Sequence, residues 1–144
     1  MKNTKYKHIL LAIDFSKGSS VVNDRAKELA IQMGAKLTLL HIVEPLPGYG
    51  YAFVGATEVE MELMEAARKQ LAKLGKKLSV AVKDQHVELG PTKVEINRVA
   101  EDLKVDLIIV GSHGRHGFDA LLGATANAVI QSAKCDVLTV RIKK

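Results

Sequence analysis

Residues 106–117 read DLIIVGSHGRHG, an apolar strand that runs directly into a glycine-rich loop. A nearly continuous apolar run such as Asp106–Val110 is typical of a parallel sheet that helices cover on both faces. Glycines let backbone N–H groups approach an anion closely and adopt positive φ. The stretch predicts a buried strand followed by a phosphate-binding loop. A flexible turn, in which the glycines only avoid clashes, is an equally open interpretation.

Outward from this stretch, apolar strands alternate with helices. This pattern predicts an α/β fold: one doubly wound domain over residues 1–144, with a parallel sheet and right-handed crossovers. The expected strands are His8–Asp14, Lys36–Ile42, Gln85–Glu88, Asp106–Val110 and Val137–Arg141. The first expected helix is capped by Ser16 and ends at Gly34. The third expected helix begins at Pro91 or Thr92, and the fourth spans Ala124–Ala133. The second is capped by Thr57 and carries an apolar stripe of Leu63, Met64, Ala67, Leu71, Leu74 and Leu78.

Composition narrows the class of protein. The chain has 144 residues, 47% of them apolar and 26% charged, as in a globular domain. Its longest apolar run, Ile9–Ile13, is too short to cross a bilayer, so no membrane partner is expected. Cys135 is the single cysteine, which fits the reducing cytoplasm. The net charge of +5 comes without a basic stripe interleaved with aromatic residues, so no nucleic-acid partner is expected either.

Ligands of open α/β sheets bind outside the carboxyl ends of strands, where the strand order reverses. If the order is 3-2-1-4-5, that crevice lies between Ala12–Phe15 and Val110–Gly117. A helix that begins after Gly123 adds partial positive charge there, and Arg115 can add a full one. The first strand is followed by DFSKG at positions 14–18, and no P-loop is present, which argues against a dinucleotide enzyme or a P-loop hydrolase.

Three segments resemble the universal stress protein family: Ile9–Ser16, Leu40–Val43 and Gly111–Gly114. The segment 106–140 resembles it too, so the likeness covers nearly the whole chain. The resemblance implies a five-stranded parallel sheet of order 3-2-1-4-5 and a homodimer. Some members of the family bind ATP through a G-x2-G-x9-G-[ST] motif, whereas others do not bind nucleotide.

This chain departs from that motif. Gly111-x2-Gly114 is intact, but Gly123 follows after eight residues and is followed by Ala124, which has no hydroxyl. Counting nine residues lands on Ala124-Thr125, which restores the hydroxyl and loses the glycine. Both registers stay open. The resemblance, together with the charge of Arg115, predicts nucleotide contacts at Ala12, Asp14, Ile42, Val110, Gly111, His113, Gly114, Arg115, Gly123, Ala124 and Thr125.

Asp14 is expected to accept a hydrogen bond from an adenine amine or a ribose hydroxyl; the alternative is that it caps the next helix. No catalytic residue is assigned, because Ser112 beside His113 is not a triad. No metal is assigned either, because no carboxylate or cysteine completes a shell around His113 and His116.

The resemblance therefore implies a dimeric, ATP-binding stress-response regulator with little or no turnover, and the single cysteine places it in the cytoplasm. Its homodimer would form through the edge strand Val137–Arg141, because an exposed edge invites pairing. The alternative is a dimeric interaction module that binds no nucleotide. An adenylyl-transferring enzyme of related fold is a third interpretation, and it lacks an evident catalytic base.

Overall fold

The structure is a computed structural model, and it describes residues 5–46, 57–112 and 123–142. Within these ranges the elements are β1 (His8–Ile13), α1 (Ser19–Met33), β2 (Lys36–Val43), α2 (Glu58–Leu78), a 3-10 turn (Val82–Asp84), β3 (Gln85–Leu89), α3 (Thr92–Asp102), β4 (Leu107–Gly111), α4 (Ala124–Ser132) and β5 (Asp136–Val140). The five strands form one parallel sheet of order β3-β2-β1-β4-β5. The predicted fold class and strand order are confirmed.

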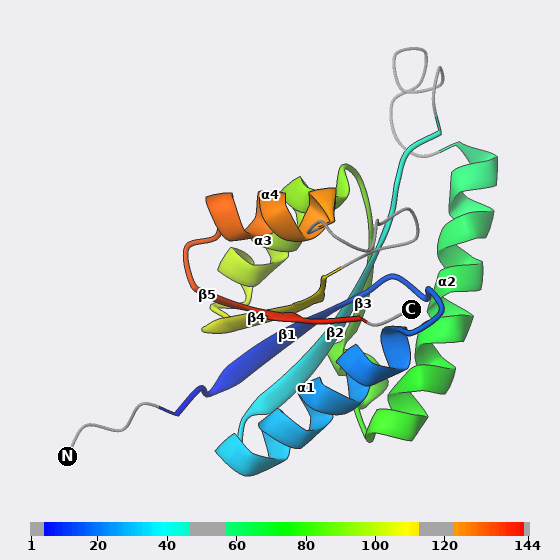
Figure 1. Ribbon diagram of the computed structural model, residues 1–144. Coiled ribbons are helices and arrows are strands. Elements are labelled where there is room, and N and C mark those ends of the chain that lie inside the picture. Colours follow the sequence, from blue (N-terminus) through cyan, green and yellow to red (C-terminus); the bar gives the residue numbers. More distant parts are fainter. Residues whose placement is uncertain (1–4, 47–56, 113–122, 143–144) are drawn as a thin grey trace.

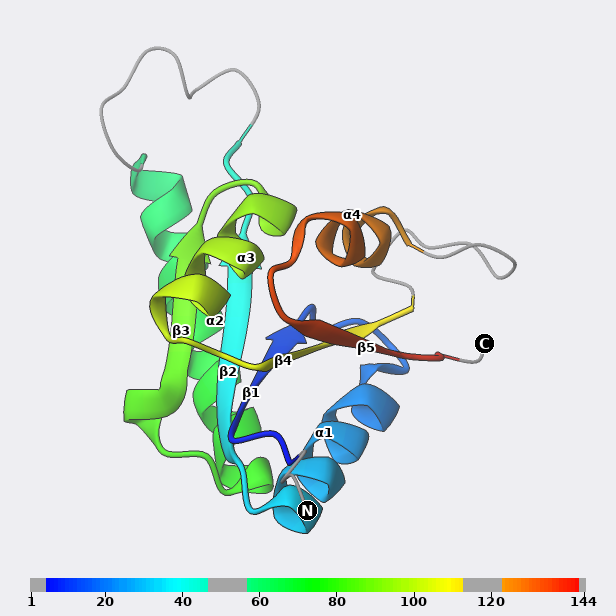
Figure 2. The ribbon, with the colours of Figure 1, turned by 90° about the vertical axis from the view of Figure 1, so that its left-hand side faces the viewer.

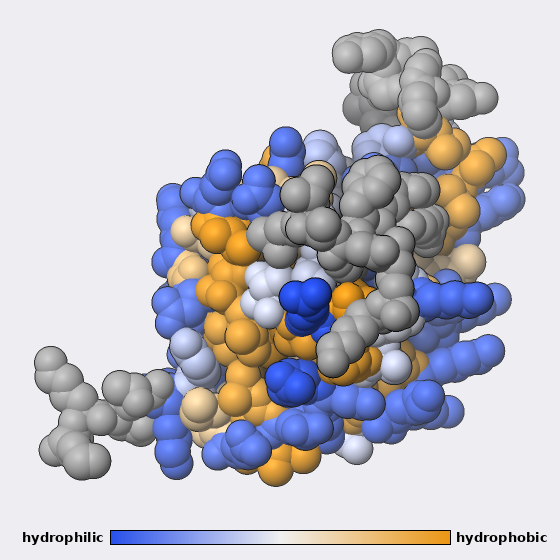
Figure 3. All heavy atoms as spheres, viewed as in Figure 1, coloured by the Kyte–Doolittle hydropathy of each residue, from blue (hydrophilic) through white to orange (hydrophobic). Residues whose placement is uncertain are grey.

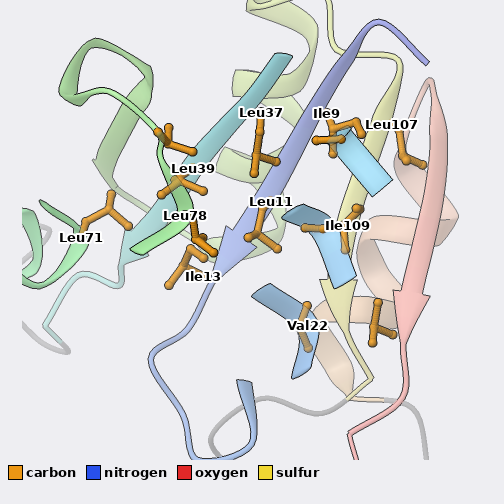
Figure 4. Packing of buried hydrophobic residues seen from close by; sticks show 14 of the residues in the cluster. Ile9, Leu11, Ile13, Val22, Leu37, Leu39, Leu71, Leu78, Leu107 and Ile109 are labelled. Atoms are coloured by element: carbon orange, nitrogen blue, oxygen red, sulfur yellow. The ribbon is translucent and has the colours of Figure 1, made fainter. Parts of the chain in front are cut away.

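Helices cover both faces of the sheet, with α1 and α2 on one side and α3 and α4 on the other (Figures 1 and 2). The strand period of two sends alternate β1 side chains to opposite faces. Ile9, Leu11 and Ile13 pack with α1 and α2, as Figure 4 shows, whereas Leu10 and Ala12 pack with α3 and α4. Each face therefore has its own apolar core.

The middle of β1 is sealed completely. Ile9, Leu10 and Leu11 are 0% exposed, because β2 and β4 flank the strand and helices cover both of its faces. Burying such a side chain contributes about 1.5–3 kcal/mol. A strand this apolar forms only inside a sheet that is covered on both sides, which explains the continuous run of sequence.

Two details of the predicted helices are wrong. Ser16 does not cap α1. The helix begins at Ser19, and its N-cap residue is Gly18, whose φ is +84°. The Ser16 carbonyl instead accepts the Ser19 N–H at 3.2 Å and the Ser19 hydroxyl at 2.7 Å, in a turn that precedes the helix. Leu63 is 43% exposed, because it lies at the edge of the α2 stripe, on the side of Ala67 away from Leu71.

The predicted ends of α1 and α2 are otherwise correct. Gly34 follows α1 in the left-handed conformation, with φ +64°, and its N–H reaches the carbonyls of Ala30 and Ile31. Thr57 caps α2. Among the described residues, no helix combines the length and the apolar character needed to cross a membrane.

Candidate functional site

The strand order places a switch point between β1 and β4. From β1 the chain continues toward β2 on one side, and from β4 it continues toward β5 on the other. Neighbouring connections that depart in opposite directions open a crevice at the carboxyl ends of the two strands. The end of β1 at Ile13 and the end of β4 at Gly111 lie on the two sides of this switch point, where the sequence predicted the crevice.

Ser112 organises the exit of β4. It is 8% exposed, and all three of its polar groups are bonded. Its N–H donates to the Val140 carbonyl at 2.8 Å, and its hydroxyl accepts the Ile142 N–H at 2.9 Å. Its carbonyl accepts the Gly123 N–H at 2.6 Å. One buried serine therefore joins the end of β4 to the end of β5 and to the start of α4.

This arrangement brings the N-terminus of α4 to the carboxyl end of β4. Gly123 occupies the N-cap position, and no side chain of the described residues caps the helix. The first turn holds no acidic residue. The Asn127 N–H donates to the Gly123 carbonyl at 3.0 Å, which closes the first helical bond. The N–H groups of residues 124–126 precede that bond and have no intrahelical acceptor in an α-helix, so they can face an anion.

The two phosphate registers now differ physically. The Gly123 N–H is already engaged by Ser112, so the amides available to a ligand begin at Ala124. The side chains of Ala124 and Thr125 are both exposed in the first turn. A hydroxyl at the amino end of α4 can therefore come from Thr125, while Ala124 supplies only its amide.

The end of β1 carries Asp14 on a tight turn. Its Oδ1 accepts the Ser16 N–H at 2.9 Å and the Ser16 hydroxyl at 2.7 Å. Asp14 therefore does not cap α1, and that alternative is wrong: α1 has Gly18 as its N-cap and no side-chain cap. The carboxylate stabilises the turn after β1 instead.

An apolar floor adjoins these polar groups. Ile42 and Val110 belong to the core on the α3 and α4 face, and Ala12 packs against it. Ile42 is 8% exposed and Val110 3%, whereas Ala12 is half-buried. Gly111 is half-buried at the last position of β4, opposite Val140. The predicted apolar contacts therefore lie on the same face of the sheet as α4.

Three predicted site residues, His113, Gly114 and Arg115, lie outside the described residues, as does His116. In the ranges that the structure does describe, no group of three or more His, Cys, Asp or Glu side chains is arranged to hold a metal ion. Sequence reasoning assigned no structural role to Ser112 or to His41. The only signal for Ser112 was a polar residue directly after the most apolar strand.

A separate surface groove of about 750 Å³ lies between α3 and α4. Lys93, Val94, Asn97 and Ser132 are among its lining residues, and none of the predicted site residues lines it. Its walls are the outward sides of two helices rather than strand ends. The crevice, with its open amides and carboxylate, is therefore the better candidate for binding a charged ligand.

The sequence profile of the universal stress protein family matches residues 5–141. The chain belongs to the universal stress protein family. Universal stress protein A homolog 2 of Coxiella burnetii is 46% identical over 141 residues, which cover 96% of this chain and 97% of that protein. The resemblance on which the sequence analysis relied is thereby confirmed.

Solved structures agree with this assignment. Hypothetical protein MJ0577, whose biochemical function was assigned from its structure, aligns with a TM-score of 0.80 and 28% identity over 98% of this chain and 99% of its own. A universal stress protein crystallised in complex with cAMP aligns with a TM-score of 0.67 and 23% identity over 96% of this chain and 98% of its own, a likeness of fold. Universal stress proteins are generally regulators rather than enzymes.

Proposed function

We propose that this universal stress protein binds ATP in the crevice between β1 and β4 and acts as a nucleotide-responsive regulator in the stress response, with little or no turnover. One observation carries the proposal: α4 begins at the carboxyl edge of the sheet with a glycine cap, no capping side chain and no acidic residue in its first turn. Such a terminus offers partial positive charge and unbonded amides to phosphate.

The other groups of the crevice fit the rest of the nucleotide. The phosphates would contact the amides of residues 124–126, together with the loop that carries Gly111, His113, Gly114 and Arg115. The adenosine would lie against Ala12, Ile42 and Val110, whose apolar side chains share one face. Asp14 would accept a hydrogen bond from a ribose hydroxyl or the adenine amine. That cAMP, an adenine nucleotide, is bound by a protein of this fold supports the choice of base.

The same proposal includes a homodimer in the cytoplasm. β5 is an edge strand, and its Val137, Leu138 and Thr139 are only half-buried in the single chain. Figure 3 shows an apolar area on the face along which β5 runs in Figure 1, with hydrophilic residues around it. Val140 is 5% exposed and belongs to the core, so a substitution there would disturb folding as well as pairing of the edge strand. Thr139→Lys should give monomers by sedimentation, because a charge on an edge strand blocks pairing; dimers that persist would exclude this edge.

Two observations favour a second candidate function. The Gly123 N–H donates to the Ser112 carbonyl and is not available to a phosphate, and Ala124 lacks the hydroxyl of the G-x2-G-x9-G-[ST] motif. A dimeric interaction module that binds no nucleotide would show this loss of phosphate contacts. It would share the fold and the edge strand, and it would differ only in the crevice.

Two measurements separate these functions. Nucleotide extracted from freshly purified protein identifies a resident ligand, and calorimetric titration with ATP and with adenosine gives the affinities. Gly114→Val adds a β-branched side chain in the glycine loop and should weaken ATP binding without unfolding the domain. If the wild type binds neither ligand at millimolar concentration, the interaction module takes the place of the nucleotide-binding regulator.

A further inference from the structure

His41 lies beside the turn that carries Asp14. In the register of the two strands, His41 of β2 lies opposite Ile13, the last residue of β1. Its Nδ1 lies 2.6 Å from the Ile13 carbonyl oxygen. A carbonyl oxygen only accepts, so Nδ1 carries the proton and donates it. The side chain of β2 therefore fixes the backbone immediately before Asp14.

The same ring contacts the residue immediately after Asp14. The rings of Phe15 and His41 have centroids 4.6 Å apart and planes inclined by 46°. Phe15 has φ +58°, a left-handed conformation that is unfavourable for a residue with a Cβ atom. Such a conformation persists only where the surroundings hold it. The His41 ring is one of the groups that hold it.

Asp14 is thus bracketed by two contacts of one side chain. Both hydrogen bonds that the described residues make to its carboxylate end on Oδ1, from the N–H and the hydroxyl of Ser16. Oδ2 is therefore the oxygen left to accept a bond from a ligand. Its direction is set by the turn, because Oδ1 is held within the turn itself.

We propose that His41 is a positioning residue for Asp14: it holds the turn of residues 13–16 in the conformation that presents the carboxylate to the nucleotide. This inference rests on the proposed function. His41 itself need not touch the ligand, since both of the contacts described above are to the turn. Ordering a flexible turn on binding costs free energy, so a turn that is already ordered in the free protein favours tighter binding.

The competing explanation is that His41 merely ties β1 to β2. The chain offers a matched control for this explanation. His8 Nε2 lies 2.7 Å from the Thr38 hydroxyl, so a second histidine bond joins the same two strands near the amino end of β1, far from the crevice. His8→Ala removes a tie of the same kind without altering the turn of Asp14.

The experiment is a double-mutant cycle on ATP affinity, measured by calorimetry, with unfolding by urea as the control for folding. His41→Ala should weaken ATP binding about tenfold, which corresponds to about 1.4 kcal/mol, and His8→Ala should leave the affinity unchanged. His41→Asn keeps a donor near the position of Nδ1 and should recover part of the loss. In the Asp14→Asn background, His41→Ala should cost little more, because the two residues act on one contact.

Three outcomes would overturn the inference while the wild type still binds ATP. These are an unchanged affinity in His41→Ala, an equal loss in His8→Ala, or fully additive losses with Asp14→Asn. Any of them would leave His41 as a tie between strands. A wild type that binds no ATP overturns the proposed function as well, so the two failures are distinguishable.

Discussion

The N-termini of α2 and α4 solve the same physical problem in opposite ways. The first N–H groups of any helix lack intrahelical acceptors. At α2 the chain supplies them: the Thr57 hydroxyl accepts the Glu60 N–H at 3.1 Å, and the Glu60 carboxylate accepts the Thr57 N–H at 2.9 Å. The other Glu60 oxygen accepts the Leu46 N–H at 2.7 Å. Two glutamates in the first turn, Glu58 and Glu60, also complement the helix dipole.

At α4 the chain supplies none of this among its described residues: the cap is Gly123, and neither a capping side chain nor an acidic residue is present in the first turn. The difference separates a structural terminus from a receptive one. Where a helix satisfies its own amides and its own dipole, an external anion gains little. Where a helix at the carboxyl edge of a parallel sheet has neither a cap nor an acidic first turn, a bound anion can supply both the hydrogen-bond acceptors and the negative charge.

The largest expected effect comes from giving α4 the acidic residue that α2 has. Ala124→Glu should weaken ATP binding about 100-fold, because a carboxylate would repel the phosphates and compete for the same amides. Ala124→Gln, of similar size but uncharged, should lose much less. Calorimetry of both variants measures the difference. ATP affinity that is unchanged in Ala124→Glu would show that the phosphates do not lie at α4.

A smaller effect distinguishes the two phosphate registers. If Ala124 takes the place of the missing hydroxyl residue, Ala124→Ser should tighten ATP about tenfold and adenosine hardly at all, because a hydrogen bond to a charged group contributes about 1.5–3 kcal/mol. If Thr125 already supplies the hydroxyl, Thr125→Val should weaken ATP and Ala124→Ser should do little. Titration of both variants with both ligands decides, and parallel changes for ATP and adenosine would refute a phosphate contact at either position.

Removing the cap of α2 should affect stability alone. Thr57→Ala should lower the free energy of unfolding by about 1 kcal/mol, as loss of an N-cap hydroxyl does. Thr125→Ala at the other terminus should change it by less than about 0.5 kcal/mol, because that side chain is exposed and makes no cap. Urea unfolding measures both. An equal loss of unfolding free energy in both variants would mean that Thr125 caps α4, so that the two helix N-termini would not differ.

The smallest effect is a pH dependence. The backbone N–H groups of Thr57 and Leu46 hold the pKa of Glu60 below its usual range. A depressed folded pKa adds stability above the unfolded value of about 4.3, and this stability is lost as pH falls through the folded pKa. The urea midpoint of the wild type should therefore exceed that of Glu60→Gln at pH 7, and the gap should narrow below about pH 4. A gap that stays constant from pH 7 to pH 3 would exclude this role.

The predictable part of the molecule is the part that local sequence determines. The cap of α2 at Thr57 was predicted, and Glu60 three residues later completes a capping box. The strand order followed from the family resemblance. The cap of α1 was predicted wrongly. Ser16 is a residue type that caps helices, but its N–H and its hydroxyl donate to the Asp14 carboxylate instead. Gly18 takes its place with φ +84°. A Cβ there would come 2.9 Å from a methyl carbon of Ile142, a contact 124 positions along the chain that no local pattern contains.

The position of the switch point between β1 and β4 was predictable, whereas the hydrogen bonds around it were not. The crevice follows from the topological rule, and its apolar residues Ala12, Ile42 and Val110 lie together as expected. The three hydrogen bonds of Ser112 were not predicted, because the strand order places β5 beside β4 but does not say which atoms at the ends of these strands and at the start of α4 meet. Those bonds decide that the Gly123 amide is unavailable, which no count of motif spacing could reveal.

The position of β1 in the sheet has a consequence for the order in which the chain assembles. β1 is flanked by β2, which follows it closely, and by β4, which is made much later; the His8 N–H donates to Asp106, 98 residues away. While synthesis proceeds, β1 and β2 can pair first, which leaves the other edge of an apolar strand unpaired and prone to aggregation. Non-local pairing of this kind is also slow. Arrival of β4 covers that edge and brings the carboxyl ends of β1 and β4 side by side, whereas the N-terminus of α4 and the edge strand β5 are added only afterwards.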